Sequence, residues 1–320
     1  MNKLSIFTLK LLQKVYIKFC GSDIEKPKYE QDPDKASKII YDVIMSDKPC
    51  MIARFGSNEL KALINYQSVK NQSRSIYKYI KGERFDWWWN DGIIKCIHEN
   101  AGFFPPTINK VEQFCELMLQ DIPEVDILGS WLPDESKFDR ELKNAKKVWL
   151  LDLEPFWANN PWTKALEGKK VLVVHPFAQT IESQYKKRNL IFPNNLLPEF
   201  ELITLKAVQS IAGEKTEYAD WFEALAYMKS EIDKRDYDIC LIGCGAYGFP
   251  LAAHVKRMGK KAFHLGGGLQ LLFGIRGKRW ETGLYKTFYN YDTLINDYWV
   301  RPDESEKPKA SNKVEDSCYW

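Results

Sequence analysis

A glycine pattern at 243–248 has the spacing of a phosphate-binding loop. Gly243, Gly245 and Gly248 form G-x-G-x-x-G, with an apolar run before them and a helical pattern after them. Glycines in such a turn let the backbone approach a ligand closely, and the N-terminus of the next helix offers free N–H groups and a positive dipole end to an anion. The pattern predicts a phosphate site, and the alternative is that these glycines only allow close strand–helix packing.

A dinucleotide-binding site also requires an acidic residue after the strand that follows the glycine pattern. An Asp or Glu about 20 residues further on, at the end of the next strand, normally holds the ribose hydroxyls. Here the next apolar run, 261–265, leads into Gly266, Gly267 and Gly268 without an acidic residue. We therefore expect neither NAD nor S-adenosylmethionine as a cofactor. The second glycine run predicts further backbone donors at the same edge of the sheet.

Three cations follow this second glycine run. Arg276, Lys278 and Arg279 stand beside Trp280 in a short segment. An Arg guanidinium binds a diphosphate through two parallel hydrogen bonds, and a Lys ammonium contributes a point charge. The segment predicts a clamp on a diphosphate, and the alternative is a solvated surface loop.

A second polar loop follows an earlier apolar run. Arg54 ends that run, and Gly56, Ser57, Asn58 and Glu59 open a helical pattern. Capping alone explains Ser57 and Glu59, because a hydroxyl caps a helix and an acid favours its first turn. The functional hypothesis is that Arg54 and Glu59 reach the same ligand edge, where the carboxylate could hold a cation, orient a ribose or act as a base.

The Arg-Phe-Gly-x-x-Glu segment formed by residues 54–59 resembles the signature of the GT-D-type glycosyltransferases, bacterial enzymes of surface-polysaccharide and capsule assembly with a Rossmann-like domain. That family usually carries Arg-Phe-Gly-Asp-Gly-Glu there. The resemblance covers about residues 35–280. It implies transfer of a sugar from a nucleotide-sugar donor to a glycan or lipid-linked acceptor, with Glu59 serving the donor or a metal. A non-catalytic sugar-nucleotide-binding or assembly protein of the same pathway is the alternative, and a NAD- or S-adenosylmethionine-dependent Rossmann enzyme is a further one.

The sequence departs from this signature at Ser57, where the family has Asp. The change removes one carboxylate from the set that would bind Mn²⁺ or Mg²⁺. Metal dependence is therefore left open. In a metal-independent branch, Arg276, Lys278 and Arg279 would neutralise the leaving diphosphate.

A third strand-to-helix turn contains His175 and Thr180. A histidine that titrates near pH 7 could deprotonate an acceptor hydroxyl, and the Thr180 hydroxyl could bind a phosphate. A structural histidine at a strand end is the alternative. Asp152 and Glu154, which lie near two tryptophans, would suit sugar hydroxyls or serve loop packing.

Short apolar runs alternate with helical patterns from residue 34 onward, which predicts an α/β, Rossmann-like fold with a mostly parallel sheet flanked by helices. The expected strands are 51–55, 125–128, 148–152, 171–175, 202–206, 239–243 and 262–265, and the expected helices are 34–46, 57–66, 110–120, 178–188, 216–234 and 247–258. The segment 67–106 fits neither pattern and is interpreted as an insertion.

Three parts are expected: an N-terminal helix and linker at 1–33, a domain at 34–300, and a polar tail at 301–320 that is frayed at 303–317. A division of the domain near 153–168 is an alternative to a single unit.

Composition and net charge limit the kinds of binding partner that are expected for this chain. A net charge of +3 without a basic arm predicts no nucleic-acid binding. Seven scattered cysteines without zinc-site spacing predict free thiols in the cytoplasm. Lysines interrupt the apolar N-terminal segment, so it is not expected to span a membrane. It is expected to be a packing or docking helix, with peripheral contact at the inner membrane face as the alternative.

Overall fold

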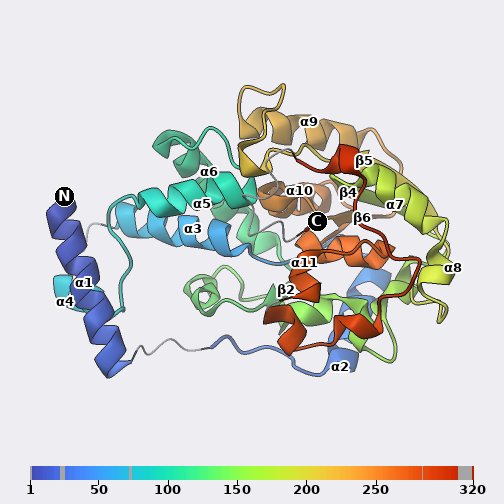
Figure 1. Ribbon diagram of the computed structural model, residues 1–320, viewed down its shortest axis with the longest axis horizontal. Helices are drawn as coiled ribbons and strands as arrows, with labels where there is room; N and C mark the ends of the chain where they lie inside the picture. The colour runs from blue at the N-terminus through green and yellow to red at the C-terminus, as the bar shows by residue number, and fades with distance from the viewer. Residues whose placement is uncertain (1, 22–25, 72–73, 283, 309–318) are drawn as a thin grey trace.

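One seven-stranded parallel sheet runs through the centre of the molecule (Figure 1). The computed structural model describes residues 2–21, 26–71, 74–282, 284–308 and 319–320. The spatial order of the strands is β3-β2-β1-β7-β6-β4-β5. Their bounds are β1 Cys50–Ala53, β2 Ile127–Ser130, β3 Lys146–Trp149, β4 Lys170–His175, β5 Glu201–Lys206, β6 Ile239–Ile242 and β7 Lys261–His264. The predicted α/β, Rossmann-like class is confirmed.

Successive residues of the inner strands point into two separate cores. In β1, Met51 and Ala53 belong to the core on one face of the sheet, and Ile52 belongs to the core on the other face. Side chains alternate across a strand, so a strand buried on both faces forms a continuous apolar run in the sequence. This explains why the inner strands could be predicted, whereas the edge strands β3 and β5 are only partly buried. The third strand ends earlier than predicted, at Trp149, because Leu150–Leu153 forms a 3-10 helix, η3.

Helices cover both faces of the sheet, with α9 on one side and α2 on the other in Figure 1. The first core is covered by α3 (Ser57–Lys70), α5 (Asp91–Ala101), α6 (Ile108–Asp121), α9 (Trp221–Asp233) and α10 (Gly248–Arg257), and the second by α2 (Pro33–Met45), α7 (Ala178–Tyr185) and α8 (Arg188–Ile191). Helix α9 starts later than expected because Asp220 caps it, its Oδ1 accepting the N–H groups of Phe222 and Glu223 at 2.9 Å.

The segment at 67–106 is more regular than its sequence indicated. Helix α3 continues to Lys70, and α4 (Ile76–Ile80) and α5 follow. The buried Asn65 side chain organises the turn between them, since its Nδ2 donates to the carbonyl oxygens of Asp86 and Trp88, both at 2.9 Å. Asn65 of α3, together with the hydrogen bonds of Tyr79 and Asn90 to Asp86, thus fixes an aromatic loop that has no periodicity of its own.

The segment at 153–168, expected as a hinge or a long loop, is a series of 3-10 turns within the second core. Trp162 is fully buried, its Nε1 donates to the carbonyl oxygen of Leu153 at 2.9 Å, and its ring centre lies 4.7 Å from that of Phe263 in β7. The strands before and after this segment, β3 and β4, belong to the same sheet.

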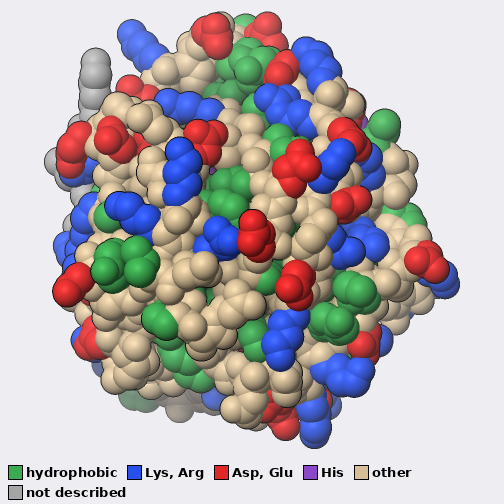
Figure 2. Space-filling view, turned by 90° about the vertical axis from the view of Figure 1, so that its right-hand side faces the viewer, with side chains coloured by type: hydrophobic (Ala, Val, Ile, Leu, Met, Phe, Trp, Pro, Cys, Tyr) green, Lys and Arg blue, Asp and Glu red, His purple; other side chains and the backbone are tan. Residues whose placement is uncertain are grey.

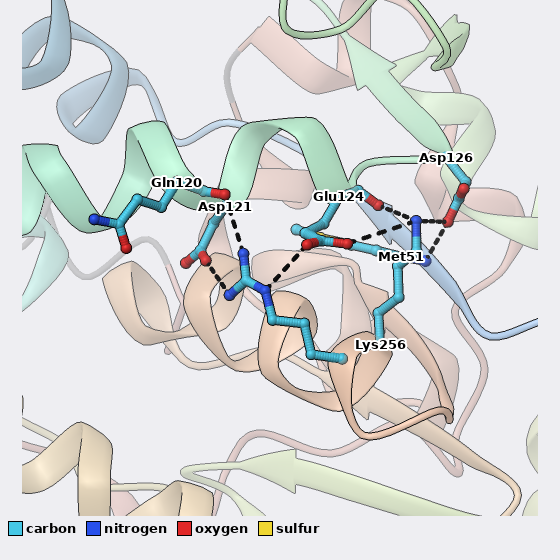
Figure 3. Close-up of polar contacts among 7 residues, drawn as sticks. Met51, Gln120, Asp121, Glu124, Asp126 and Lys256 are labelled. Atoms are coloured by element: carbon cyan, nitrogen blue, oxygen red, sulfur yellow. Dashed lines mark hydrogen bonds and ion pairs between the residues drawn. The ribbon is translucent and has the colours of Figure 1, made fainter.

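Ion pairs fix α10, the helix that follows the first glycine loop (Figure 3). Arg257 binds the carboxylate of Asp121 at 2.6 Å and that of Glu124 at 3.0 Å. Lys256 binds Asp126 at 2.8 Å, and Asp126 also accepts a backbone N–H of β1. Burial raises the pKa of Asp121 to about 6, although Arg257 opposes the shift. The network ties α10 to α6 and to the strand that leads into the Arg54–Glu59 loop.

The first part of the tail packs against the domain. Glu306 is buried, and its carboxylate accepts the backbone N–H groups of Gln179 at 2.8 Å and Thr180 at 3.2 Å. A carboxylate is favourable there because the start of α7 presents free N–H groups and a positive dipole end. The prediction of a frayed tail is therefore wrong for residues 303–308, and residues 309–317 lie outside the described part of the chain.

Helix α1 (Lys3–Cys20) stands apart from the sheet and packs on α4 (Figure 1). Leu9 is its buried residue, and the Gln13 side chain donates to the carbonyl oxygen of Tyr79 at 2.7 Å. Among the described residues, no helix is both long and apolar enough to cross a membrane.

Candidate functional site

A cavity of about 290 Å³ opens at the carboxyl edge of the sheet. The loops that follow β1, β7, β6 and β4 meet there, because these strands are neighbours and parallel. Ligands of open α/β sheets bind at this edge. The residues predicted from sequence that line the cavity are Arg54, Gly56, Ser57, Asn58, Glu59, His175, Gly243, Gly245, Gly266, Gly267 and Arg279. Thr180, Gly248, Arg276 and Lys278 are not among its lining residues.

Glycines of both predicted runs form one wall of the cavity. A Cβ on Gly243 would lie 2.7 Å from the carbonyl oxygen of Gly266, so the two loops pack backbone to backbone. Gly245 and Gly266 have φ values of +58° and +65°, which L side chains rarely adopt. Gly248 has a packing role instead, since a Cβ there would lie 2.1 Å from the ring of His264.

The Glu59 carboxylate folds back over the start of its own helix. A Cβ on Gly56 would lie only 1.9 Å from Glu59 Oε2. Gly56 is the N-cap of α3 and has no side chain to cap it, and Ser57 is the first residue of the helix. The capping interpretation of Ser57 is therefore wrong, because its hydroxyl does not cap α3. Because Gly56 has no side chain, the Glu59 carboxylate can lie against the backbone at the cavity wall.

Arg54 enters the cavity from the end of β1. Its guanidinium lies 5.3 Å from the ring centre of Trp131, a distance that allows a cation–π interaction. The Trp131 indole donates to the carbonyl oxygen of Phe55 at 3.1 Å. The buried Glu135 accepts the N–H groups of Trp131 and Leu132 at 3.1 and 3.0 Å. Arg54 is thus held in place by the loop after β2, which the sequence analysis did not assign to the site.

Of the three cations expected to clamp a diphosphate, the cavity receives Arg279. Its Nη1 donates to the hydroxyl of Tyr319 at 3.0 Å, and its guanidinium lies 4.5 Å from the Tyr319 ring centre. Arg276 is bound instead to Glu281 at 2.8 Å. The predicted three-residue clamp is therefore wrong, since Arg276 and Lys278 lie outside the cavity and Arg276 is neutralised by an acid five residues further on.

His175 lines the cavity in a neutral form. Burial lowers its pKa to about 3, and its Nδ1 accepts the backbone N–H of Phe177 at 3.0 Å. The proton of the neutral ring is consequently on Nε2, which makes this atom a donor. Burial and the charge of Arg54 lower the pKa of His264 to about 3 as well. The expectation that His175 titrates near pH 7 is not met.

Thr180 is engaged outside the cavity. Its hydroxyl donates to the carboxylate of Glu306 and accepts the backbone N–H of Asp303 at 3.0 Å. The predicted phosphate position at the start of α7 is therefore occupied by a carboxylate of the chain itself.

Several lining residues were missed because they come from segments without a glycine or charge pattern. Ser210, after β5, binds the carbonyl oxygen of Gly102 at 2.6 Å and the hydroxyl of Tyr247 at 2.9 Å. Tyr319 and Trp320 reach the cavity from the C-terminus. The Tyr319 carbonyl oxygen accepts from Gln270 at 3.1 Å. Ser210 could have been found from its position after a predicted strand. Nothing in the local sequence indicated that Tyr319 lines the cavity.

Glu154 lies beside the cavity. It lines a smaller pocket together with Arg54 and Arg279, and its carboxylate accepts from the hydroxyl of Tyr291 at 2.7 Å. Burial raises its pKa to about 7. Asp152 accepts from Tyr289 at 2.8 Å, and burial raises its pKa to about 6. The sequence grouped these two acids with aromatic residues, and the structure does the same.

Among the side chains of the described residues that line the cavity, positive charge exceeds negative charge, since Glu59 is the carboxylate there, against the guanidiniums of Arg54 and Arg279. No three His, Cys, Asp or Glu side chains of the described residues gather as a metal site would require. Trp131, Tyr247 and Tyr285 add aromatic rings, and the terminal Tyr319 and Trp320 lie at the same cavity with Tyr319 engaged on Arg279. This combination suits an anion attached to an aromatic or sugar ring.

A comparison with protein-family models, one with curated proteins and one with solved structures found no significant match. The function is therefore argued from the site itself.

Proposed function

We propose that the chain is a glycosyltransferase that moves a sugar from a nucleotide-sugar donor to a glycan or lipid-linked acceptor. The observation that carries the proposal is the convergence of two glycine loops, Arg54, Arg279 and Glu59 on one cavity at the carboxyl edge of the sheet. Backbone N–H groups and guanidiniums bind phosphate oxygens, and the aromatic rings offer faces to a base or a sugar.

In the proposed reaction, the bond between the anomeric carbon and the diphosphate oxygen breaks, and its electron pair goes to that oxygen. The acceptor oxygen forms the new bond to the anomeric carbon, and its proton passes to a base. Arg54 and Arg279 stabilise the charge that develops on the diphosphate, which lowers the barrier. We assign the base to Glu59, because His175 has its proton on the nitrogen that would have to accept one.

The charge of the cavity supports diphosphate neutralisation by arginine. Mg²⁺ and Mn²⁺ prefer several oxygen ligands with negative charge, and the cavity offers Glu59 with the neutral side chains of Ser57 and Asn58. Two guanidiniums nearby repel a divalent cation. We propose that donor binding does not depend on such a cation, although Glu59 is the residue that would hold one. Equal donor affinity with and without a chelator supports this branch.

The test begins with a thermal-shift screen of ADP-, GDP-, UDP- and dTDP-linked hexoses. A ligand that binds only the native state raises the melting temperature. Release of nucleoside diphosphate from the selected donor then measures turnover. Glu59→Gln is expected to bind the donor and lose turnover by about 10²-fold or more, the lower range for loss of a general base. Unchanged turnover in Glu59→Gln excludes the catalytic assignment. Donor binding without turnover in the unmodified chain supports the alternative of a sugar-nucleotide-binding protein.

A further inference from the structure

Helix α1 presents an apolar surface that nothing in the described chain covers. Six of its large apolar side chains are exposed, among them Leu4 at 74%, Phe7 at 65% and Phe19 at 80%. Burying such side chains elsewhere would be favourable by about 25 cal/mol for each Å² removed from water. Isolated exposed apolar residues are ordinary, but a contiguous group marks an interaction site.

The exposed side chains of α1 form two adjacent stripes. Successive residues of a helix are about 100° apart, so the members of each stripe can be placed by their spacing. The apolar arc spans about 100° and consists of Leu4, Leu11, Leu12, Val15 and Phe19. The lysine border lies directly beside it and consists of Lys3, Lys14 and Lys18, with Phe7 between the last two.

The remaining face of α1 holds the helix to the rest of the protein. Leu9 is buried, and Lys10 binds Asp86 at 3.4 Å and lies 5.9 Å from the ring centre of Trp88. Gln13 donates to Tyr79, and the Ile17 side chain lies beside Gly82. The apolar arc is therefore directed outward by specific contacts on the opposite face. It is a fixed feature of the fold.

Charge decides between the possible occupants of this surface. Residues 3–20 contain four lysines and no Asp or Glu. Two copies of α1 facing each other would bring like charges together, which is unfavourable. An anionic partner would be attracted. The face shown in Figure 2, on the side of the molecule away from α1, has basic and acidic side chains interspersed, so the charge of α1 is not a general property of the surface.

We infer that α1 binds the surface of an anionic lipid bilayer, with the apolar arc at the acyl boundary and the lysine border among the headgroup phosphates. A helix that lies in the membrane interface requires this combination of an apolar face and flanking cations. The helix lies in the plane of the bilayer. The inference does not depend on the proposed transferase activity, because it concerns a surface outside the cavity.

The test uses the full chain and flotation with vesicles. One set contains phosphatidylcholine alone, and the other contains phosphatidylcholine and phosphatidylglycerol. Two variants change one stripe each: Leu11→Gln with Phe19→Gln shortens the apolar arc, and Lys3→Gln with Lys14→Gln and Lys18→Gln removes the lysine border. Glutamine is a good helix former, so both variants keep α1, and circular dichroism verifies this. Phe288→Gln is the matched control, because Phe288 is also an exposed phenylalanine, at 54%, on another part of the molecule.

We expect the unmodified chain and Phe288→Gln to bind the phosphatidylglycerol vesicles, and added salt to weaken binding. Each lysine near an anionic surface contributes about a fivefold increase in partitioning, so the lysine variant should lose at least about tenfold. The apolar variant should lose at least about tenfold as well. Equal binding to phosphatidylcholine vesicles would overturn the inference. Failure to bind either set would overturn it too, and an α1-dependent dimer in the same sample would identify a second copy as the occupant.

Discussion

The place of the Glu59 carboxylate can be tested without changing Glu59. At Gly56, φ is −72° and ψ is 141°, values that any L-residue adopts, so alanine fits the backbone. Restriction of the unfolded chain favours folding of Gly56→Ala by about 0.4–1 kcal/mol, and the weaker preference of alanine for an N-cap position opposes this by a similar amount. The added Cβ would, however, lie 1.9 Å from Glu59 Oε2, and ordinary contact begins at 3.4 Å. The carboxylate oxygen must therefore move by 3.4 − 1.9, or about 1.5 Å.

A shift of about 1 Å in a catalytic group can reduce a rate by about 10²-fold, which is near 2.7 kcal/mol of transition-state stabilisation. We expect Gly56→Ala to remain folded, with a free energy of unfolding within about 1 kcal/mol of that of the unmodified protein, and to lose donor turnover by about 10²-fold. Urea unfolding measures the first quantity, and release of nucleoside diphosphate measures the second.

Gly92→Ala is the matched control. Gly92 lies in the first turn of α5 and is absent from the lining of the cavity, and its nearest neighbour would be the flexible Asn90 side chain at 3.1 Å. A second check combines Gly56→Ala with Glu59→Ala. Gly56→Ala should then cause no further loss of turnover, because the Glu59 carboxylate that it would displace is absent. Full turnover in Gly56→Ala would refute the assignment of Glu59.

Other predictions concern the support and the mouth of the site. Arg257→Gln leaves the buried Asp121 carboxylate without its closest cation and should lower the free energy of unfolding by about 2–4 kcal/mol, as measured by urea unfolding. Because the pKa of Asp121 is raised in the folded state, the folded chain binds more protons than the unfolded chain, and stability falls as pH rises from about 4 through about 6. Loss of Arg257 raises that pKa further, so the stability difference between the variant and the unmodified chain should grow as pH rises above about 6, where Asp121 ionises in the folded unmodified chain but not yet in the variant. A difference that stays constant with pH would contradict it. Deletion of Tyr319 and Trp320 should tighten nucleoside diphosphate binding by about fivefold or more in a calorimetric titration, because Tyr319 engages Arg279, a proposed phosphate ligand, and breaking such a contact costs about 1 kcal/mol. Weaker binding would show that these rings support the ligand rather than compete with it.

The sheet and the edge at which the cavity opens could be predicted because both depend on local sequence. Residues 171–174 are apolar and buried on both faces, and such runs identify strands. Once the strands are parallel, their following loops share one edge, so Arg54 and Gly243 had to lie on the same side of the sheet. The positions of Gly243 and Gly245 at this edge could be predicted for the same reason, because they too follow a parallel strand.

The remaining features depend on contacts between residues far apart in the chain. Glu306 reaches Thr180, and Tyr319 reaches Arg279, across long separations that no local pattern encodes. The basic segment was misread for a related reason. Arg276 has the charge of a phosphate ligand, but the acid that neutralises it, Glu281, lies in α11 (Lys278–Glu281), a helix that was not predicted.

The most direct test of the central claim is a calorimetric titration of the unmodified chain, Arg279→Gln and Arg276→Gln with UDP, GDP, ADP and dTDP. The two variants make the same substitution three residues apart, inside and outside the cavity. A charge-assisted hydrogen bond to phosphate contributes about 1.5–3 kcal/mol, so Arg279→Gln should weaken binding of the preferred diphosphate by at least about tenfold. Arg276→Gln should bind it as the unmodified chain does. No binding of any of the four, or equal affinities in the two variants, would contradict the account.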